Sequence, residues 1–270
     1  MPKSYEYINF DILEPIKANS SNFFVEINFM ILQIPPIKIE PIITWEPLPT
    51  DFVLPDDPVE NIQQPTLAAA LTDALGAARL IQSEMLIGSN FGLVATINNK
   101  TIVKAPDWFY VPKVYPVTKG TVRRSYTQHL EGEPISIVME FLSETENGEL
   151  SVRATPPYGK LYFYQQILQV PTYVTYDPYA PSLEVRCLQN ERYVIQEAND
   201  QGQVWIPELQ LFLGIWSGER LGQSMNWLRW WDRSGNLLLW SAEQSEQERL
   251  RAEKLAAKLR ELGIDLDALT

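Results

Sequence analysis

Two carboxylates interrupt stretches of the sequence that are otherwise apolar and strand-like. Asp107 opens the run "DWFYV", and Glu140 lies within "ISIVMEFLSE", residues 135 to 144. Acidic side chains are almost never fully buried unless they are paired, because an unpaired buried carboxylate is costly or has a raised pKa. Two such acids on neighbouring strands can share one cation, and their hard oxygens suit Mg²⁺ or Mn²⁺.

A lysine follows the two acids along the chain. Lys160 lies in "PPYGKLYFYQQIL", residues 156 to 168. A lysine beside a bound metal can orient or help to deprotonate a water, or neutralise charge that develops on a phosphate. Asp107, Glu140 and Lys160 therefore fit the metal-assisted hydrolysis of a phosphodiester. By spacing alone, two strand-end acids that are solvated or salt-bridged fit equally well.

The elements that would position these residues alternate between strands and helices. Period and turn residues predict a helix over 66–82 and strands over 85–96, 100–104, 107–112 and 135–142. They then predict a helix over 156–168, a strand in "TYVTYDP", a hairpin around Gln189-Asn190, further strands over 203–216 and 226–240, and a helix over 241–262. This order predicts an α/β or α+β fold with a central mixed sheet.

The two ends of the chain differ from this central region. Residues 1–60 contain many prolines, which exclude long helices and central strands, so we expect an extended arm. Residues 61–240 would form the folded domain. Residues 241–270 form a charged helix with a leucine stripe, which can pack on the domain or join two chains as a homodimer.

Composition narrows the classes of protein that fit. The chain has 270 residues and a net charge of -12, which argues against a protein that coats DNA non-specifically. Cys187 is the only cysteine and His129 the only histidine, which excludes disulfides and most zinc enzymes. The single cysteine fits a reducing cytoplasm. No apolar run is long enough for a membrane helix.

Several stretches together resemble a known family. They include "VKAPDWFYVP", "ISIVMEFLSETENGE", "GKLYFYQQILQVPTYVTYDP" and the tryptophan-rich "NWLRWWDRSGNLLLW". In this order they resemble the Uma-two family of restriction-endonuclease-like proteins, which is common in cyanobacteria. The resemblance extends over roughly residues 43 to 267.

The resemblance implies a fold, an activity and roles for particular residues. The family is similar to the PD-(D/E)xK nucleases, which have a mixed central sheet flanked by helices; here a hairpin and a helix would be added at the C-terminus. It implies a Mg²⁺- or Mn²⁺-dependent endonuclease acting on DNA, with Asp107 and Glu140 as metal ligands. Leu142 occupies the position where the superfamily usually has lysine, so Lys160 is the expected replacement. Glu84 is a candidate for a further metal ligand.

A second function also fits the same features. Since position 142 lacks the lysine and the chain is acidic, the protein can instead be a catalytically inactive interaction or regulatory protein that retains the nuclease fold. Its binding element would be the C-terminal helix. The tryptophan-rich hairpin can either stack on bases or pack against that helix.

Overall fold

The computed structural model describes residues 40–53, 62–142 and 150–262. The chain divides into two units, Met1–Glu40 and Pro41–Thr270, and all described helices and strands belong to the second. Most of the predicted N-terminal arm and the last residues of the predicted tail, 263–270, lie outside the described residues.

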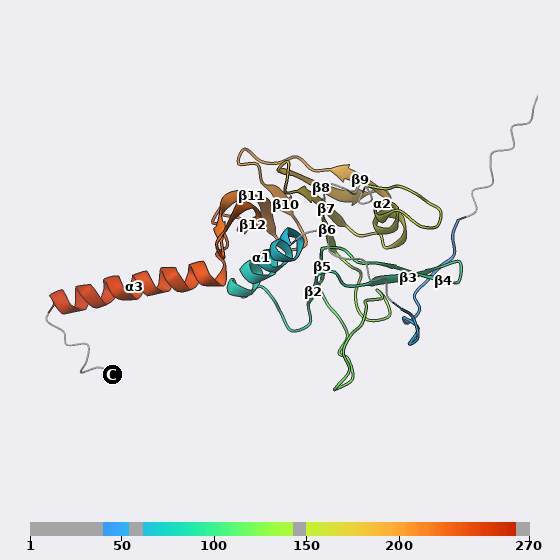
Figure 1. Ribbon diagram of the computed structural model, residues 1–270, viewed down its shortest axis with the longest axis horizontal. Helices are drawn as coiled ribbons and strands as arrows, with labels where there is room; N and C mark the ends of the chain where they lie inside the picture. The colour runs from blue at the N-terminus through green and yellow to red at the C-terminus, as the bar shows by residue number, and fades with distance from the viewer. Residues whose placement is uncertain (1–39, 54–61, 143–149, 263–270) are drawn as a thin grey trace, which may run out of the picture. The chain divides into compact units, whose positions relative to one another are not determined.

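A mixed sheet of six strands forms the centre of the second unit (Figure 1), in the order β2-β5-β6-β7-β8-β9. β6 and β7 are parallel, and the other neighbouring strands are antiparallel. β5 and β6 are buried along their whole length, which explains their almost continuous apolar sequence. The strands are β2 (Leu86–Gly88), β5 (Trp108–Val111), β6 (Ile137–Phe141), β7 (Thr172–Asp177), β8 (Ser182–Gln189) and β9 (Arg192–Ile195).

Each face of this sheet is covered by a different set of elements. Side chains alternate between the faces, as they must in a strand. On one face, Trp108 and Met139 pack with helix α1 (Gln63–Ala77) and the C-terminal strands. On the other, Phe109 and Val138 pack with a second small sheet and a short helix. The predicted α+β fold, with a restriction-endonuclease-like mixed sheet flanked by helices, is confirmed.

The segment predicted as one strand over 85–96 forms two strands in two sheets. After β2 the chain turns at Asn90, whose φ is 47° and whose N–H donates to the Pro106 carbonyl (2.9 Å). Asn98 and Asn99, with φ of 49° and 61°, form the hairpin turn before the strand over 100–104. The strand over 100–104 pairs with the strand over 93–97, so both belong to a second sheet and do not continue the central one. The second sheet contains β1 (Ile43–Thr44), β3 (Leu93–Ile97) and β4 (Lys100–Lys104).

The helix predicted over 156–168 begins later, at Lys160. Gly159 still has extended backbone angles (φ −68°, ψ 150°), and prolines 156 and 157 precede it. One helical turn, α2 (Lys160–Tyr162), then continues as a π-helical turn, η1 (Phe163–Ile167). Such turns are rare in proteins, and those that occur often lie at functional sites.

A hairpin and a long helix follow the central sheet, as predicted. Strands β10 (Val204–Ile206), β11 (Leu211–Arg220) and β12 (Gln223–Trp231) form the third sheet, and α3 (Ser241–Glu261) follows. The Arg229 guanidinium joins these parts. It is fully buried, bonds the Glu243 carboxylate (2.6 Å) and stacks over the Trp240 ring (3.4 Å). The tryptophan-rich hairpin thus packs against the start of α3.

This joint should contribute strongly to stability. We expect Arg229→Ala to lower the free energy of unfolding by about 3–5 kcal/mol, because it empties the space of a large, fully buried side chain and removes its hydrogen bonds and its stacking on Trp240. Arg233→Ala is the matched control, since Arg233 lies over the Trp205 ring but is exposed. Its cost should be below about 1 kcal/mol. Urea unfolding measures both, and equal losses in the two variants would contradict the role of Arg229.

Candidate functional site

Asp107 immediately precedes β5 and completes the hydrogen bonding of the next strand. Trp108 is paired with Met139, so Asp107 stands opposite Glu140 on the same face of the sheet. The Asp107 side chain is buried, and its Oδ2 accepts a hydrogen bond from the Phe141 N–H (2.6 Å). The carboxylate just before this buried strand thus has a structural reason: it supplies the hydrogen-bond acceptor for a backbone N–H of β6.

Glu140 lies at the centre of the site and is completely buried. Lys160 Nζ approaches its Oε2 (3.2 Å), and the Tyr164 hydroxyl donates to its Oε1 (2.8 Å). Each carboxylate oxygen therefore has one donor from the α2–η1 segment. The structure brings Asp107, Glu140 and Lys160 together, as the sequence predicted.

The α2–η1 segment places both donors over one carboxylate. Lys160 begins α2, and Tyr164 lies one helical turn later, where side chains share a face. Tyr164 is fully buried, and its ring packs on Tyr173 of β7 (centroids 5.4 Å apart). The hydroxyl is thus held in place by packing on the sheet below.

Burial controls the protonation of the Glu140 carboxyl group. Burial, the largest cause, and the nearby Asp107 carboxylate raise the pKa of Glu140, which lies at about 8 when all its neighbours are included. The Lys160 ammonium and the Tyr164 hydrogen bond oppose this rise because they favour the ionised form. Burial, and then the Glu140 carboxylate, hold the pKa of Tyr164 well above its usual range, so its hydroxyl remains a donor. A cation beside Glu140 would favour the ionised carboxylate.

Helix α1 contributes a residue that the sequence analysis did not single out. Gln64, in the first turn of α1, is buried, and its Nε2 donates to the Phe141 carbonyl (2.9 Å). Tyr164 was also missed, because "LYFYQQI" reads as ordinary core packing. Only the meeting of distant elements shows that both residues belong to the site.

Glu84 does not join this group. It is exposed, and its carbonyl accepts the Val114 N–H (2.8 Å) beyond the far end of β5. Leu86 pairs with Val111, so Glu84 lies at the opposite end of that strand pair from Asp107. The early helix reaches the site through its N-terminus, with Gln64, whereas Glu84 follows its C-terminus.

The donor set fits a small hard cation. Mg²⁺ typically binds to one or two carboxylates and completes its octahedron with water and substrate phosphate oxygens. Asp107 and Glu140 provide the two carboxylates on one face of the sheet. Within residues 40–53, 62–142 and 150–262, no group of three or more His, Cys, Asp or Glu side chains could hold a metal.

The chain matches the model of one protein family. A family model, Uma2, described as "Putative restriction endonuclease", matches residues 53–221, more than half of the chain. The chain belongs to the Uma2 family. No curated protein matches the sequence.

The Uma2 match separates the site from the C-terminal addition. Asp107, Glu140, Lys160 and Tyr164 all lie inside the matched range, whereas β12 and α3 lie outside it. In this Uma2 member Leu142 continues the strand pairing, with its N–H on the Tyr176 carbonyl (2.8 Å), and the ammonium at Glu140 comes from α2. None of the helices in the described parts of the chain is long and apolar enough to cross a membrane.

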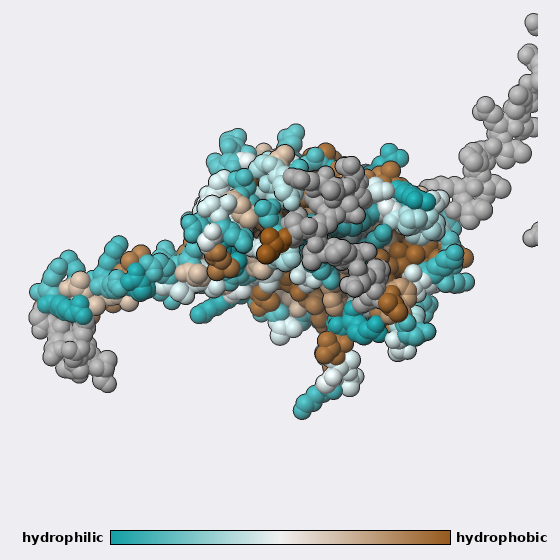
Figure 2. Space-filling view, viewed as in Figure 1, coloured by the Kyte–Doolittle hydropathy of each residue, from teal (hydrophilic) through white to brown (hydrophobic). Residues whose placement is uncertain are grey.

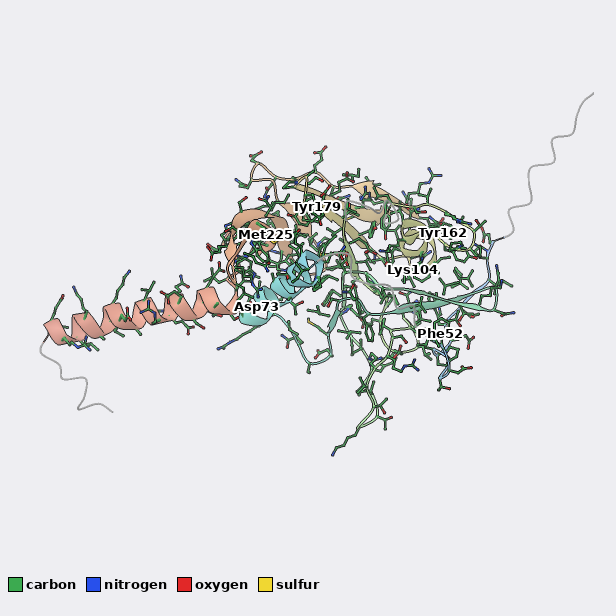
Figure 3. The ribbon with its side chains drawn as sticks, in the orientation of Figure 1. Phe52, Asp73, Lys104, Tyr162, Tyr179 and Met225 are labelled. Carbon is green, nitrogen blue, oxygen red and sulfur yellow. The ribbon has the colours of Figure 1, made fainter. Side chains whose placement is uncertain are left out.

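The hydroxyl of Tyr164 allows a specific test of the site. Tyr164→Phe should lower the free energy of unfolding by about 1–3 kcal/mol, because the buried Glu140 carboxyl loses a donor. It should also raise the pKa of Glu140 further, which carbonyl NMR of isotope-labelled glutamate can follow. Tyr162→Phe is the matched control: Tyr162, labelled in Figure 3, is half-buried and stacks on Tyr158. Equal effects of the two substitutions would exclude the role of the Tyr164 hydroxyl.

Proposed function

We propose that this Uma2 member is a metal-dependent endonuclease that hydrolyses phosphodiester bonds in DNA in the cytoplasm. The observation that supports it most directly is the pair of buried acids, Asp107 and Glu140, with the Lys160 ammonium beside Glu140 on a restriction-endonuclease-like sheet. Burying two acids opposite each other is unfavourable for folding alone, and a shared cation offsets that cost.

In this proposal each residue has a distinct task. Asp107 and Glu140 would hold Mg²⁺ or Mn²⁺, which when bound acts as a Lewis acid and lowers the pKa of a coordinated water. Lys160 would orient the attacking water or neutralise negative charge that develops on the phosphate. Tyr164 fixes the orientation of the Glu140 carboxylate through its hydrogen bond (2.8 Å). Gln64 and Asp107 hold the end of β6 through the two backbone groups of Phe141.

A plasmid assay tests the proposed activity. Purified protein is incubated with supercoiled plasmid and Mn²⁺ or Mg²⁺, in parallel with a chelator and with the Asp107→Ala variant. The proposal expects nicked or linear DNA only with the parent protein and free metal. Asp107→Ala that cleaves as well as the parent, or a parent that leaves the plasmid intact with both metals, would overturn it.

A second candidate function rests on α3. No side chain of this helix is buried, and Figure 2 shows a mainly hydrophilic surface with separate hydrophobic residues along it. Leu250, Leu255 and Leu262 are among the exposed leucines. An inactive interaction protein, or a nuclease that forms a homodimer, would use this surface.

Truncation separates the stability of the domain from self-association. A chain that ends after Gln247 keeps Glu243, the partner of Arg229, so its melting temperature should stay within about 2 °C of the parent. A chain that ends after Ala242 loses Glu243 and should melt distinctly lower. Light scattering decides the role of the leucines. If the parent and the chain that ends after Gln247 have the same oligomeric state, the leucines of α3 do not join two chains.

A further inference from the structure

A row of polar side chains crosses the central sheet beside the candidate site. Glu140 is paired with Thr175 of β7, and Thr175 is paired with Glu184 of β8. With Asp107 opposite Glu140, four successive strands contribute one side chain each to the same face. Three strand spacings separate the ends of this row, about 14 Å.

The row is buried at one end and opens to solvent at the other. Glu140 is 0% exposed and Thr175 is 4% exposed, whereas the Glu184 side chain is 47% exposed. A ligand that enters from the open end would therefore pass Glu184 and then Thr175 on its path to the two buried acids. The side chains beside that path decide which charge it can carry.

Arg186 brings a positive charge to this path. It is two residues after Glu184 on β8 and on the same face, and its Nη1 donates to the Thr175 Oγ1 (3.0 Å). Its Nη2 bonds the Glu184 carboxylate. The Arg186 side chain is only 12% exposed. The guanidinium thus lies in the row, next to Thr175 and one strand further from Glu140.

The ion pair with Glu184 does not account for this placement. A pair whose acid is half-exposed contributes between nothing and about 1 kcal/mol, and it could form equally well in solvent. Arginine instead suits phosphate, because its planar fork donates two parallel hydrogen bonds to phosphate oxygens. Thr175 holds that fork along the row, so it is oriented before a ligand arrives.

We infer that Arg186, positioned by Thr175, binds a phosphate group of DNA that flanks the scissile phosphate. The inference rests on the proposed nuclease function and adds a substrate-binding residue to it. The Arg186 guanidinium, bonded to Thr175 of β7, lies about two strand spacings, roughly 10 Å, from the Asp107 end of the row, too far to share the metal-bound phosphate. The flanking phosphate replaces Glu184 as the partner of the guanidinium, and Glu184 turns into solvent.

Duplex oligonucleotides with one neutral methylphosphonate linkage test this assignment. The linkage is moved step by step along the strand around the cleaved bond, and single-turnover cleavage with Mn²⁺ is measured at each position. With the parent protein, one flanking position should lower the rate by about 10- to 100-fold, the worth of one hydrogen-bonded charge pair. Arg186→Gln should lose the same factor on unmodified DNA and become insensitive to the linkage at that position.

Two further variants make the result specific. Arg186→Lys keeps the charge but loses the planar fork, so its cleavage rate should show an intermediate sensitivity to the methylphosphonate linkage. It also replaces Arg186→Gln in the test if that variant folds poorly. Arg192→Gln, on the exposed edge strand β9, is the matched control and should retain the full sensitivity of the parent. If Arg186→Gln retains the parent's position dependence while both cleave DNA, the inference is wrong and the nuclease stands. If the parent cleaves no unmodified DNA, both fall.

Discussion

Lys160→Met is expected to slow metal-dependent DNA cleavage by about 10²- to 10³-fold, the usual cost of removing one charged donor from a catalytic centre. The reason is its contact with Glu140 Oε2 (3.2 Å), which places the ammonium beside the acid that would hold the metal. Lys160→Arg should recover only part of the rate, because a guanidinium is wider and cannot take the same position in a packed site. Single-turnover cleavage at saturating Mn²⁺ measures both.

A lysine far from the cluster provides the control for charge. Lys119 is exposed in the loop between β5 and β6, so Lys119→Met removes the same charge without touching Glu140. Its rate should remain within about threefold of the parent. A Lys160→Met variant that cleaves at the rate of Lys119→Met would show that Lys160 serves only as the ion-pair partner of Glu140.

Glu140→Gln should change how stability depends on pH and metal. In the parent, burial raises the pKa of Glu140 from 4.5 to about 8. Between these pH values the folded chain binds more protons than the unfolded chain, so the free energy of unfolding falls as pH rises from about 4.5 to 8. Mg²⁺ or Mn²⁺ should counter this loss near pH 8, because it binds the ionised folded form.

The glutamine variant should lack both responses. Without the titrating group, the metal-free variant should melt at pH 8 at the same temperature as the parent or higher, and millimolar metal should not raise it. Glu131→Gln is the control, since Glu131 pairs with Arg123 away from this site and should leave the metal response unchanged. If Glu140 serves only to pair with Lys160, the variant melts well below the parent at every pH, because the ammonium loses its partner. Thermal melts across pH, with and without metal, separate these outcomes.

Sequence patterns reveal the site residues whose type differs from that of their apolar neighbours. Asp107 and Glu140 were visible because each is a carboxylate in an apolar run, and an unpaired buried acid is expensive. Tyr164 does not stand out in its segment, because an aromatic residue on a packed helix is explained by core packing alone. Its role depends on one hydroxyl that meets β6 in space.

Register explains what else the sequence did not show. That Thr175 and Arg186 lie in line with Glu140 follows from which strands are neighbours and how they are aligned, and single-strand patterns contain neither fact. Glu84 was expected beside the two acids but lies away from them, because the direction of α1 relative to the sheet decides which of its ends reaches β6. The strands over 85–104 were predicted, but their division between two sheets depends on the turn at Asn90.

The bond from the Phe141 amide to the Asp107 carboxylate (2.6 Å) makes this backbone hydrogen a natural spectroscopic reporter. Short bonds to an ionised acceptor move an amide proton resonance downfield, and protonation or cation binding at the acceptor weakens them. A spectrum of protein carrying isotope-labelled phenylalanine would therefore follow occupancy at Asp107 without DNA and without any turnover. Deuterium exchange of the same hydrogen would measure how often the end of β6 opens, linking the occupancy of the site to the motion of the sheet that supports it.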